Sequence, residues 1–148
     1  MERKTPNELR VFAECIRLVT LQTLESFGAG HIGGSMSIVE TLAVLYGGAL
    51  RCDPNNPQWE GRDRLVLSKG HAGPALYATL CLRGFFPKEM LSELNKGGGR
   101  LPSHCDRLKT PGVDMTTGSL GQGMSAAIGM ALGLRMNGSD SVTYLILG

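Results

Sequence analysis

Two short apolar segments constrain the fold of this chain more than any other feature of its sequence. Residues 64–68 and 142–147 are rich in valine, leucine and isoleucine, which is typical of short buried β-strands. Segments with helical periodicity separate the two. Strands that alternate with helices predict an α/β fold, with a parallel sheet covered by helices on both faces. In such sheets, ligands bind beyond the carboxyl ends of the strands.

The helices are expected where apolar residues recur at helical spacing behind a capping residue. Thr5 and Glu8 form a capping box around Pro6, and this first helix should end at Gly28. Ser37 and Glu40 form a second capping box, for a helix that reaches about Leu50. Further helices are expected at about 74–83, from about 87 to the glycine run 97–99, and at 121–136. The segments 28–35, 51–63 and 100–120 are expected to be loops.

Length and composition exclude several classes of protein. A chain of 148 residues is about one domain, and its net charge of +2 comes with no basic patch, so no nucleic-acid partner is expected. No uninterrupted apolar run approaches the roughly 18 residues that would span a membrane, so no membrane association is expected. The four cysteines show no Cys-x-x-Cys spacing, and with no signal peptide they predict reduced thiols in a cytoplasmic protein.

All three histidines of the chain directly follow a small residue in a turn-rich stretch. The pairs are Gly30-His31, Gly70-His71 and Ser103-His104, and a glycine-rich run follows at 116–123. Small residues let the backbone approach a ligand closely, and histidine can donate, accept or carry a proton near neutral pH. Taken singly, each histidine could be an ordinary loop residue. Their repetition predicts one polar ligand pocket lined by loops.

The helix expected at 121–136 contains small residues on one face. Ser125, Gly129 and Gly133 are four residues apart, and such spacing allows two helices to pack with their backbones close. Glycine costs about 1 kcal/mol relative to alanine in a helix, so a compensating contact is expected. A tight helix contact, such as one between subunits, is the preferred interpretation; a flexible helix end is the alternative.

Four segments in order resemble the amino-terminal part of transketolase, in the thiamine-diphosphate-dependent family, over essentially all 148 residues. They are residues 30–35 (Gly-His-Ile-Gly-Gly-Ser), 63–72 (Asp-Arg-Leu-Val-Leu-Ser-Lys-Gly-His-Ala), Ser103-His104 with 110–114 (Thr-Pro-Gly-Val-Asp), and 117–123 (Thr-Gly-Ser-Leu-Gly-Gln-Gly). The Ser-Lys-Gly-His form and the Pro-Gly-Val-Asp spacing look most like two-gene transketolases, whose amino-terminal subunit is a separate chain. The resemblance implies a transferase that moves a two-carbon ketol unit between sugar phosphates, as in the pentose phosphate pathway.

The resemblance also implies roles for individual residues. His71 would contact the diphosphate of thiamine diphosphate, and Gly118, Ser119 and Leu120 would lie against the cofactor. His31 and His104 would line the substrate channel as the catalytic histidines and hydrogen-bond the sugar hydroxyls. The implied partner is a carboxy-terminal transketolase subunit or domain, within a homo- or hetero-oligomer such as a dimer.

The chain departs from the family pattern in two places. Cys105 stands where the family has proline after the histidine. The Gly-Asp-Gly signature would begin at Gly148, so the aspartate and asparagine that bind Mg²⁺ in the family are absent from this chain, and no metal ligand is assigned. We therefore expect residues 1–148 to be a partial diphosphate-binding domain, a truncated piece of a longer protein, and inactive alone.

Two alternatives stay open at this point. A deoxyxylulose-phosphate-synthase-like enzyme would keep the cofactor and change the reaction. A non-catalytic remnant that dimerises through residues 121–136 would have no activity.

Overall fold

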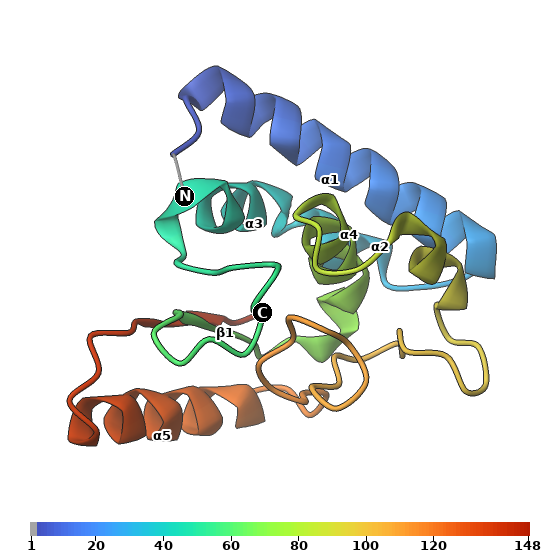
Figure 1. Cartoon of the computed structure of the whole chain (residues 1–148). Coiled ribbons are helices and arrows are strands. Elements are labelled where there is room, and N and C mark those ends of the chain that lie inside the picture. The colour runs from blue at the N-terminus through green and yellow to red at the C-terminus, as the bar shows by residue number, and fades with distance from the viewer. Residues whose placement is uncertain (1–2) are drawn as a thin grey trace.

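The computed structural model describes residues 3–148 and shows a small parallel sheet between two helical layers (Figure 1). The elements run α1 (Pro6–Phe27), α2 (Ile32–Met36), α3 (Val39–Val44), the π-helical turn η1 (Leu45–Ala49), β1 (Arg64–Leu67), the 3₁₀ turn η2 (Gly70–Ala72), α4 (Gly73–Leu82), the 3₁₀ helix η3 (Lys88–Glu93), α5 (Gln122–Met136) and β2 (Thr143–Ile146). Figure 1 shows α5 along one side of the strands and the layer of α1, α3 and α4 on the other.

The two predicted strands pair in parallel, which confirms the α/β interpretation. Arg64 is opposite Thr143 and Leu67 is opposite Ile146, so the strands run in register to the same edge. All but the first residue of β1 are buried, whereas β2 is partly exposed along most of its length. The ladder continues beyond both strands, with N···O distances of 2.9 Å from Arg64 N to Val142 O and from Ser68 N to Ile146 O.

Helix α1 begins and ends as its sequence predicts. The Thr5 side chain accepts a hydrogen bond from the N–H of Glu8, and the Glu8 carboxylate accepts one from the N–H of Thr5, at 2.8 Å. Gly28 ends the helix in the left-handed conformation, at φ 81°, where a Cβ would be strained. Its buried face includes Phe12, Ile16 and Val19, and α1 packs on α3 and α4.

The segment 28–50 differs from its prediction in two respects. The expected loop contains the short helix α2, and the second capping box is wrong, because the N-cap residue of α3 is Ile38 and not Ser37. The Ser37 hydroxyl instead donates to the Gly34 carbonyl at 3.0 Å. The helix does reach about Leu50, but its last turn is π-helical, with Gly48 at φ 140°.

The helix predicted after residue 87 also differs from its expected form. The helix expected from about residue 87 to the glycine run is a shorter 3₁₀ helix, η3, that ends at Glu93.

Residues 32–49 have a mean hydropathy of 1.2 over 18 residues, and a helix of this length and composition could cross a membrane. The segment is divided into α2, α3 and η1, and Val39 and Leu42 within it are completely buried in the core. Ile32 and Val44 of the same segment are 52% and 49% exposed.

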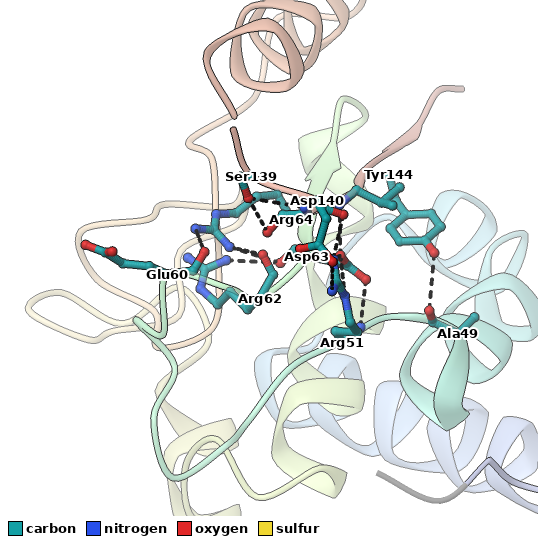
Figure 2. Close-up of polar contacts among 11 residues, drawn as sticks. Ala49, Arg51, Glu60, Arg62, Asp63, Arg64, Ser139, Asp140 and Tyr144 are labelled. Carbon is teal, nitrogen blue, oxygen red and sulfur yellow. Dashed lines mark hydrogen bonds and ion pairs between the residues drawn. The ribbon is translucent and has the colours of Figure 1, made fainter. Parts of the chain in front are cut away.

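An ion-pair network fixes the amino-terminal ends of both strands (Figure 2). The Asp63 carboxylate accepts from Arg51 N at 2.9 Å, from the Arg51 guanidinium at 3.0 Å and 3.1 Å, and from Val142 N at 2.8 Å. Arg51 also pairs with the exposed Asp140 at 3.0 Å. The network joins the segment before β1 to the segment before β2, which sets their register at the edge opposite the histidines.

Candidate functional site

The candidate site lies where β1 and β2 end together. His71 sits in the 3₁₀ turn η2 just after β1, and Gly148 follows β2 at the same edge. A Cβ on Gly148 would lie 2.4 Å from Lys69 Cδ, so the two strand ends are in close contact. This is the edge at which a parallel sheet normally presents its ligand groups.

The structure brings all three histidines together at this edge, as their repeated sequence context predicted. The ring centroids of His31 and His71 are 5.1 Å apart, and those of His31 and His104 are 6.2 Å apart. His31 comes from the start of α2, His71 from η2, and His104 from the loop after η3. His31 and His104 are exposed and His71 is partly buried, so the cluster opens to solvent.

Glycines make this convergence possible by close backbone contact. A Cβ on Gly34 would lie 2.7 Å from Cδ2 and 2.8 Å from Nε2 of the His71 ring. A Cβ on Gly70 would lie 2.5 Å from the Thr117 carbonyl oxygen. A side chain at position 70 would collide with the Thr117 backbone, so the 116–118 loop can approach this turn only because residue 70 is glycine. A side chain at position 34 would instead displace the His71 ring from its present place.

The loop 113–118 takes the place of a neighbouring strand along the second edge of β1. The Asp114 carboxylate accepts from Leu65 N at 2.7 Å, and the Thr117 hydroxyl donates to the Leu67 carbonyl at 2.6 Å. Asp114 also pairs with Arg62. Burial raises the pKa of Asp114 despite the Leu65 N–H and the Arg62 charge. These contacts place Gly118 beside His104, with a Cβ-to-ring distance of 3.7 Å.

Cys105 directly follows His104, at the position where the resemblance to transketolase predicts proline. Its side chain is almost completely buried, and burial raises the pKa of this thiol to about 12. Its carbonyl accepts from Thr117 N at 3.1 Å, which joins the His104 loop to the glycine-rich loop. The substitution therefore leaves His104 within the cluster.

The charges around His71 favour its neutral form. Burial, followed by the neighbouring charges of His31, Lys69 and His104, lowers the pKa of His71. A neutral imidazole can both donate and accept a hydrogen bond. The same positive surroundings would favour an anion bound beside it, and a bound anion would raise that pKa.

Gly118, Ser119 and Leu120, expected to contact a cofactor, are exposed just before α5. Gly118 lines an open cavity of ≈ 330 Å³ together with the first turn of α5. Leu120 is 61% exposed. The structure groups Gly118 with His104 and leaves Leu120 facing solvent.

One buried residue of this edge was not singled out from the sequence. Lys69 is only 7% exposed, and its Nζ donates to Ser37 Oγ at 2.7 Å. The Ser-Lys-Gly-His segment contains it, but nothing in that segment indicates that the lysine is buried. Within residues 3–148, no three His, Cys, Asp or Glu side chains gather as a metal site would require, so this part of the chain does not by itself fit Mg²⁺.

Comparison with known proteins gives a consistent result. Residues 9–141 match the family described as "Transketolase, thiamine diphosphate binding domain". The chain is 56% identical over 141 residues to the 6-deoxy-6-sulfo-D-fructose transketolase subunit SqwG of Clostridium sp. (strain MSTE9), covering 95% of this chain and 51% of that one. It is 41% identical over 120 residues to one subunit of the apulose-4-phosphate transketolase of Phocaeicola vulgatus, covering 81% and 42% respectively.

Solved structures agree with the sequence relatives. A transketolase from Campylobacter jejuni superposes with a TM-score of 0.90 at 32% identity, covering 98% of this chain and 24% of that one. A transketolase mutant from Pichia stipitis gives a TM-score of 0.90 at 31% identity, covering 95% and 22% respectively. The chain spans about half the length of the two subunits that it resembles. These findings favour the transketolase interpretation over both alternatives left open by the sequence.

Proposed function

The chain belongs to the transketolase family, in its thiamine-diphosphate-binding part, and from this we propose that it contributes the diphosphate site of a ketol transferase. The reaction would move a two-carbon unit from a ketose donor to an aldose acceptor. The observation that carries this proposal is the cluster of His31, His71 and His104 at the carboxyl edge of the sheet, with centroid distances of 5.1 Å and 6.2 Å.

The residues at this edge are suited to thiamine diphosphate. A Cβ on Gly34 would overlap the His71 ring in its present place, and Gly118 lies beside His104. His71 would hold the diphosphate, with Gly118, Ser119 and Leu120 along the cofactor. When bound, thiamine diphosphate supplies the electron sink that allows the bond beside a ketone to break. We also propose Mg²⁺ as the metal, held by groups that residues 3–148 do not supply.

The exposed histidines would bind the sugar and manage its protons. His31 and His104 lie on the solvent side of the cluster, where a polyhydroxylated substrate can reach them. Neutral imidazoles offer one donor and one acceptor each, which matches sugar hydroxyls. Histidine is also a common side chain for proton transfer to and from substrate hydroxyls.

The names of the relatives suggest which donors to test. The 56% identical relative is named for 6-deoxy-6-sulfo-D-fructose, and another for apulose 4-phosphate. We propose a ketose with an anionic terminal group, either sulfonate or phosphate, as the donor. The proposed setting is a cytoplasmic oligomer with a carboxy-terminal transketolase subunit or domain. The four cysteines, all free, suit that compartment.

A donor panel tests this function. The full-length protein, assembled with its carboxy-terminal transketolase counterpart, is supplied with thiamine diphosphate, Mg²⁺ and an aldose phosphate acceptor. 6-Deoxy-6-sulfofructose, fructose 6-phosphate and xylulose 5-phosphate are compared as donors, and the two-carbon-extended product is measured. Turnover that falls at least about 100-fold in His31→Ala supports the proposal. No transfer from any ketose donor would overturn it.

A further inference from the structure

Lys69 is a buried cation with no carboxylate partner in the part of the chain that the structure describes. It is 7% exposed, and none of the ion pairs formed within residues 3–148 includes it. Among residues 3–148, its Nζ donates to one side-chain partner, Ser37 Oγ, at 2.7 Å. Burying an ammonium group without an anion is unfavourable by several kcal/mol, even with one neutral hydrogen bond.

Lys69 lies at the same edge of the sheet as the three histidines. The residue directly follows Ser68 at the end of β1 and comes two residues before His71. Its Nζ would be 3.1 Å from a Cβ on Gly148, at the end of β2. The ammonium therefore lies between the two strand ends and α2, at the edge that the histidines share.

The groups around this point are themselves positive or neutral. The charges that act most on His71 are those of His31, Lys69 and His104. The Ser37 hydroxyl, which accepts from Lys69, donates onward to the Gly34 carbonyl at 3.0 Å. The ammonium keeps two further N–H donors, which Ser37 does not use.

We propose that Lys69 is the counter-charge for the diphosphate bound at this edge, donating its free N–H groups to phosphate oxygens. The inference rests on the proposed function, because it deepens the role of the same site. It accounts for the presence of a buried lysine at this edge, since lysine seldom lies buried without a partner. An ammonium there matches a diphosphate as a compact charge, and hydrogen bonds between charged groups are stronger than neutral ones.

The competing explanation is that Lys69 has only a structural role, in which it holds Ser37, and through it Gly34, against η2. The two explanations differ in what Ser37→Ala does. A structural contact between Lys69 and Ser37 would be lost to the same extent in Lys69→Met and in Ser37→Ala. A counter-charge is lost in Lys69→Met but survives in Ser37→Ala, where the ammonium and its other donors remain.

Binding measurements on the full-length protein distinguish these explanations without using turnover. Titration calorimetry with thiamine diphosphate, thiamine and inorganic pyrophosphate is compared for the wild type, Lys69→Met, Ser37→Ala and the control Lys88→Met, which removes an exposed lysine on η3. We expect Lys69→Met to weaken thiamine diphosphate and pyrophosphate about 10- to 100-fold. Thiamine should bind all four proteins alike. Ser37→Ala and Lys88→Met should change diphosphate binding less than about 3-fold.

Each contrary result has a separate meaning. Equal losses in Lys69→Met and Ser37→Ala, or an equal loss for thiamine, would assign Lys69 a structural role and overturn the inference. If the wild type binds thiamine diphosphate and Lys69→Met binds it equally well, the inference is overturned and the proposed function is left intact. Lys69-dependent binding of pyrophosphate without binding of thiamine diphosphate would overturn the proposed function and support an anion site. Ribose 5-phosphate, used as a further ligand, would show a Lys69-dependent affinity only if the site takes substrate phosphate, which would overturn the assignment to the diphosphate.

Discussion

At the scale of single residues, the site depends on a glycine that touches a histidine ring. Gly34→Ala would place a Cβ 2.7 Å from His71 Cδ2, so the ring must move. We expect thiamine diphosphate affinity to fall at least about 10-fold, while the free energy of unfolding changes by less than about 1 kcal/mol, because the ring is the free end of a side chain. Calorimetric titration and denaturant unfolding measure the two quantities.

Gly33→Ala is the matched control. It lies in the same helix, and a Cβ there meets nothing within 4 Å. Alanine should leave cofactor affinity unchanged and slightly stabilise the protein, since it is the better helix former. If both variants lost affinity equally, the contact with His71 would not be the cause.

The charge state of His71 gives a second prediction at this scale. Burial and the nearby positive charges lower the pKa of His71 in the free protein. A bound diphosphate adds negative charge beside the ring and should raise that pKa, so affinity should increase as pH falls through the histidine range. Histidine NMR titration with and without pyrophosphate measures the shift. A pKa that stays the same or falls on binding would place the anion elsewhere.

At the scale of elements, the Asp63 network should control both the register of the sheet and its acid stability. Burial tends to raise the pKa of Asp63, but hydrogen bonds from Arg51 N and Val142 N, and the Arg51 guanidinium, outweigh it and lower the pKa. A lowered carboxyl pKa contributes stability above the unfolded-state pKa, and this stability is lost as pH falls through the folded-state pKa. Asp63→Asn should cost about 2 kcal/mol or more at neutral pH and flatten the acid limb of the stability curve.

Denaturant unfolding from pH 3 to pH 8 tests the Asp63 prediction. Asp140→Asn is the control, because its side chain is 85% exposed and pairs with the same arginine. Exposed pairs contribute little, so this variant should stay within about 0.5 kcal/mol of the wild type. An acid limb that keeps its wild-type slope in Asp63→Asn would show that another carboxyl is responsible.

Elements that depend on local contacts could be predicted from the sequence, whereas those that depend on distant contacts could not. Helix α1 was predicted from its first residue to its last, because Thr5, Glu8 and Gly28 act through contacts within a few residues. The capping box at Ser37 was wrong, because its hydroxyl is engaged by Lys69, 32 residues away. The convergence of the histidines was predicted from their shared context after a small residue in turn-rich stretches, and the edge at which His71 lies was predicted from strand order, since parallel strands end at one edge. The burial of Lys69 was not, because it depends on how α2 packs over that edge.

At the scale of the whole molecule, the outer face of α5 remains without a partner in residues 3–148. Met124, Ile128, Leu132 and Met136 are four residues apart and between 43% and 86% exposed. Gly129 and Gly133 meet nothing within 4 Å. The tight packing expected of this helix is therefore not supplied within the described chain, and an exposed apolar stripe of this kind is typical of an interaction surface.

Gly129→Leu separates a contact between subunits from a flexible helix end. Within one chain the leucine has open space and is a better helix former than glycine, so monomer stability should rise by about 0.5–1 kcal/mol. If two α5 helices pack closely across an interface, the same side chain prevents their approach, and the assembly should dissociate. Analytical ultracentrifugation of the full-length protein measures association, and Gly129→Ala is the smaller control substitution. If Gly129→Leu is more stable but its assembly has the same mass as the wild type, close packing of α5 between subunits is excluded and the glycines have no packing role.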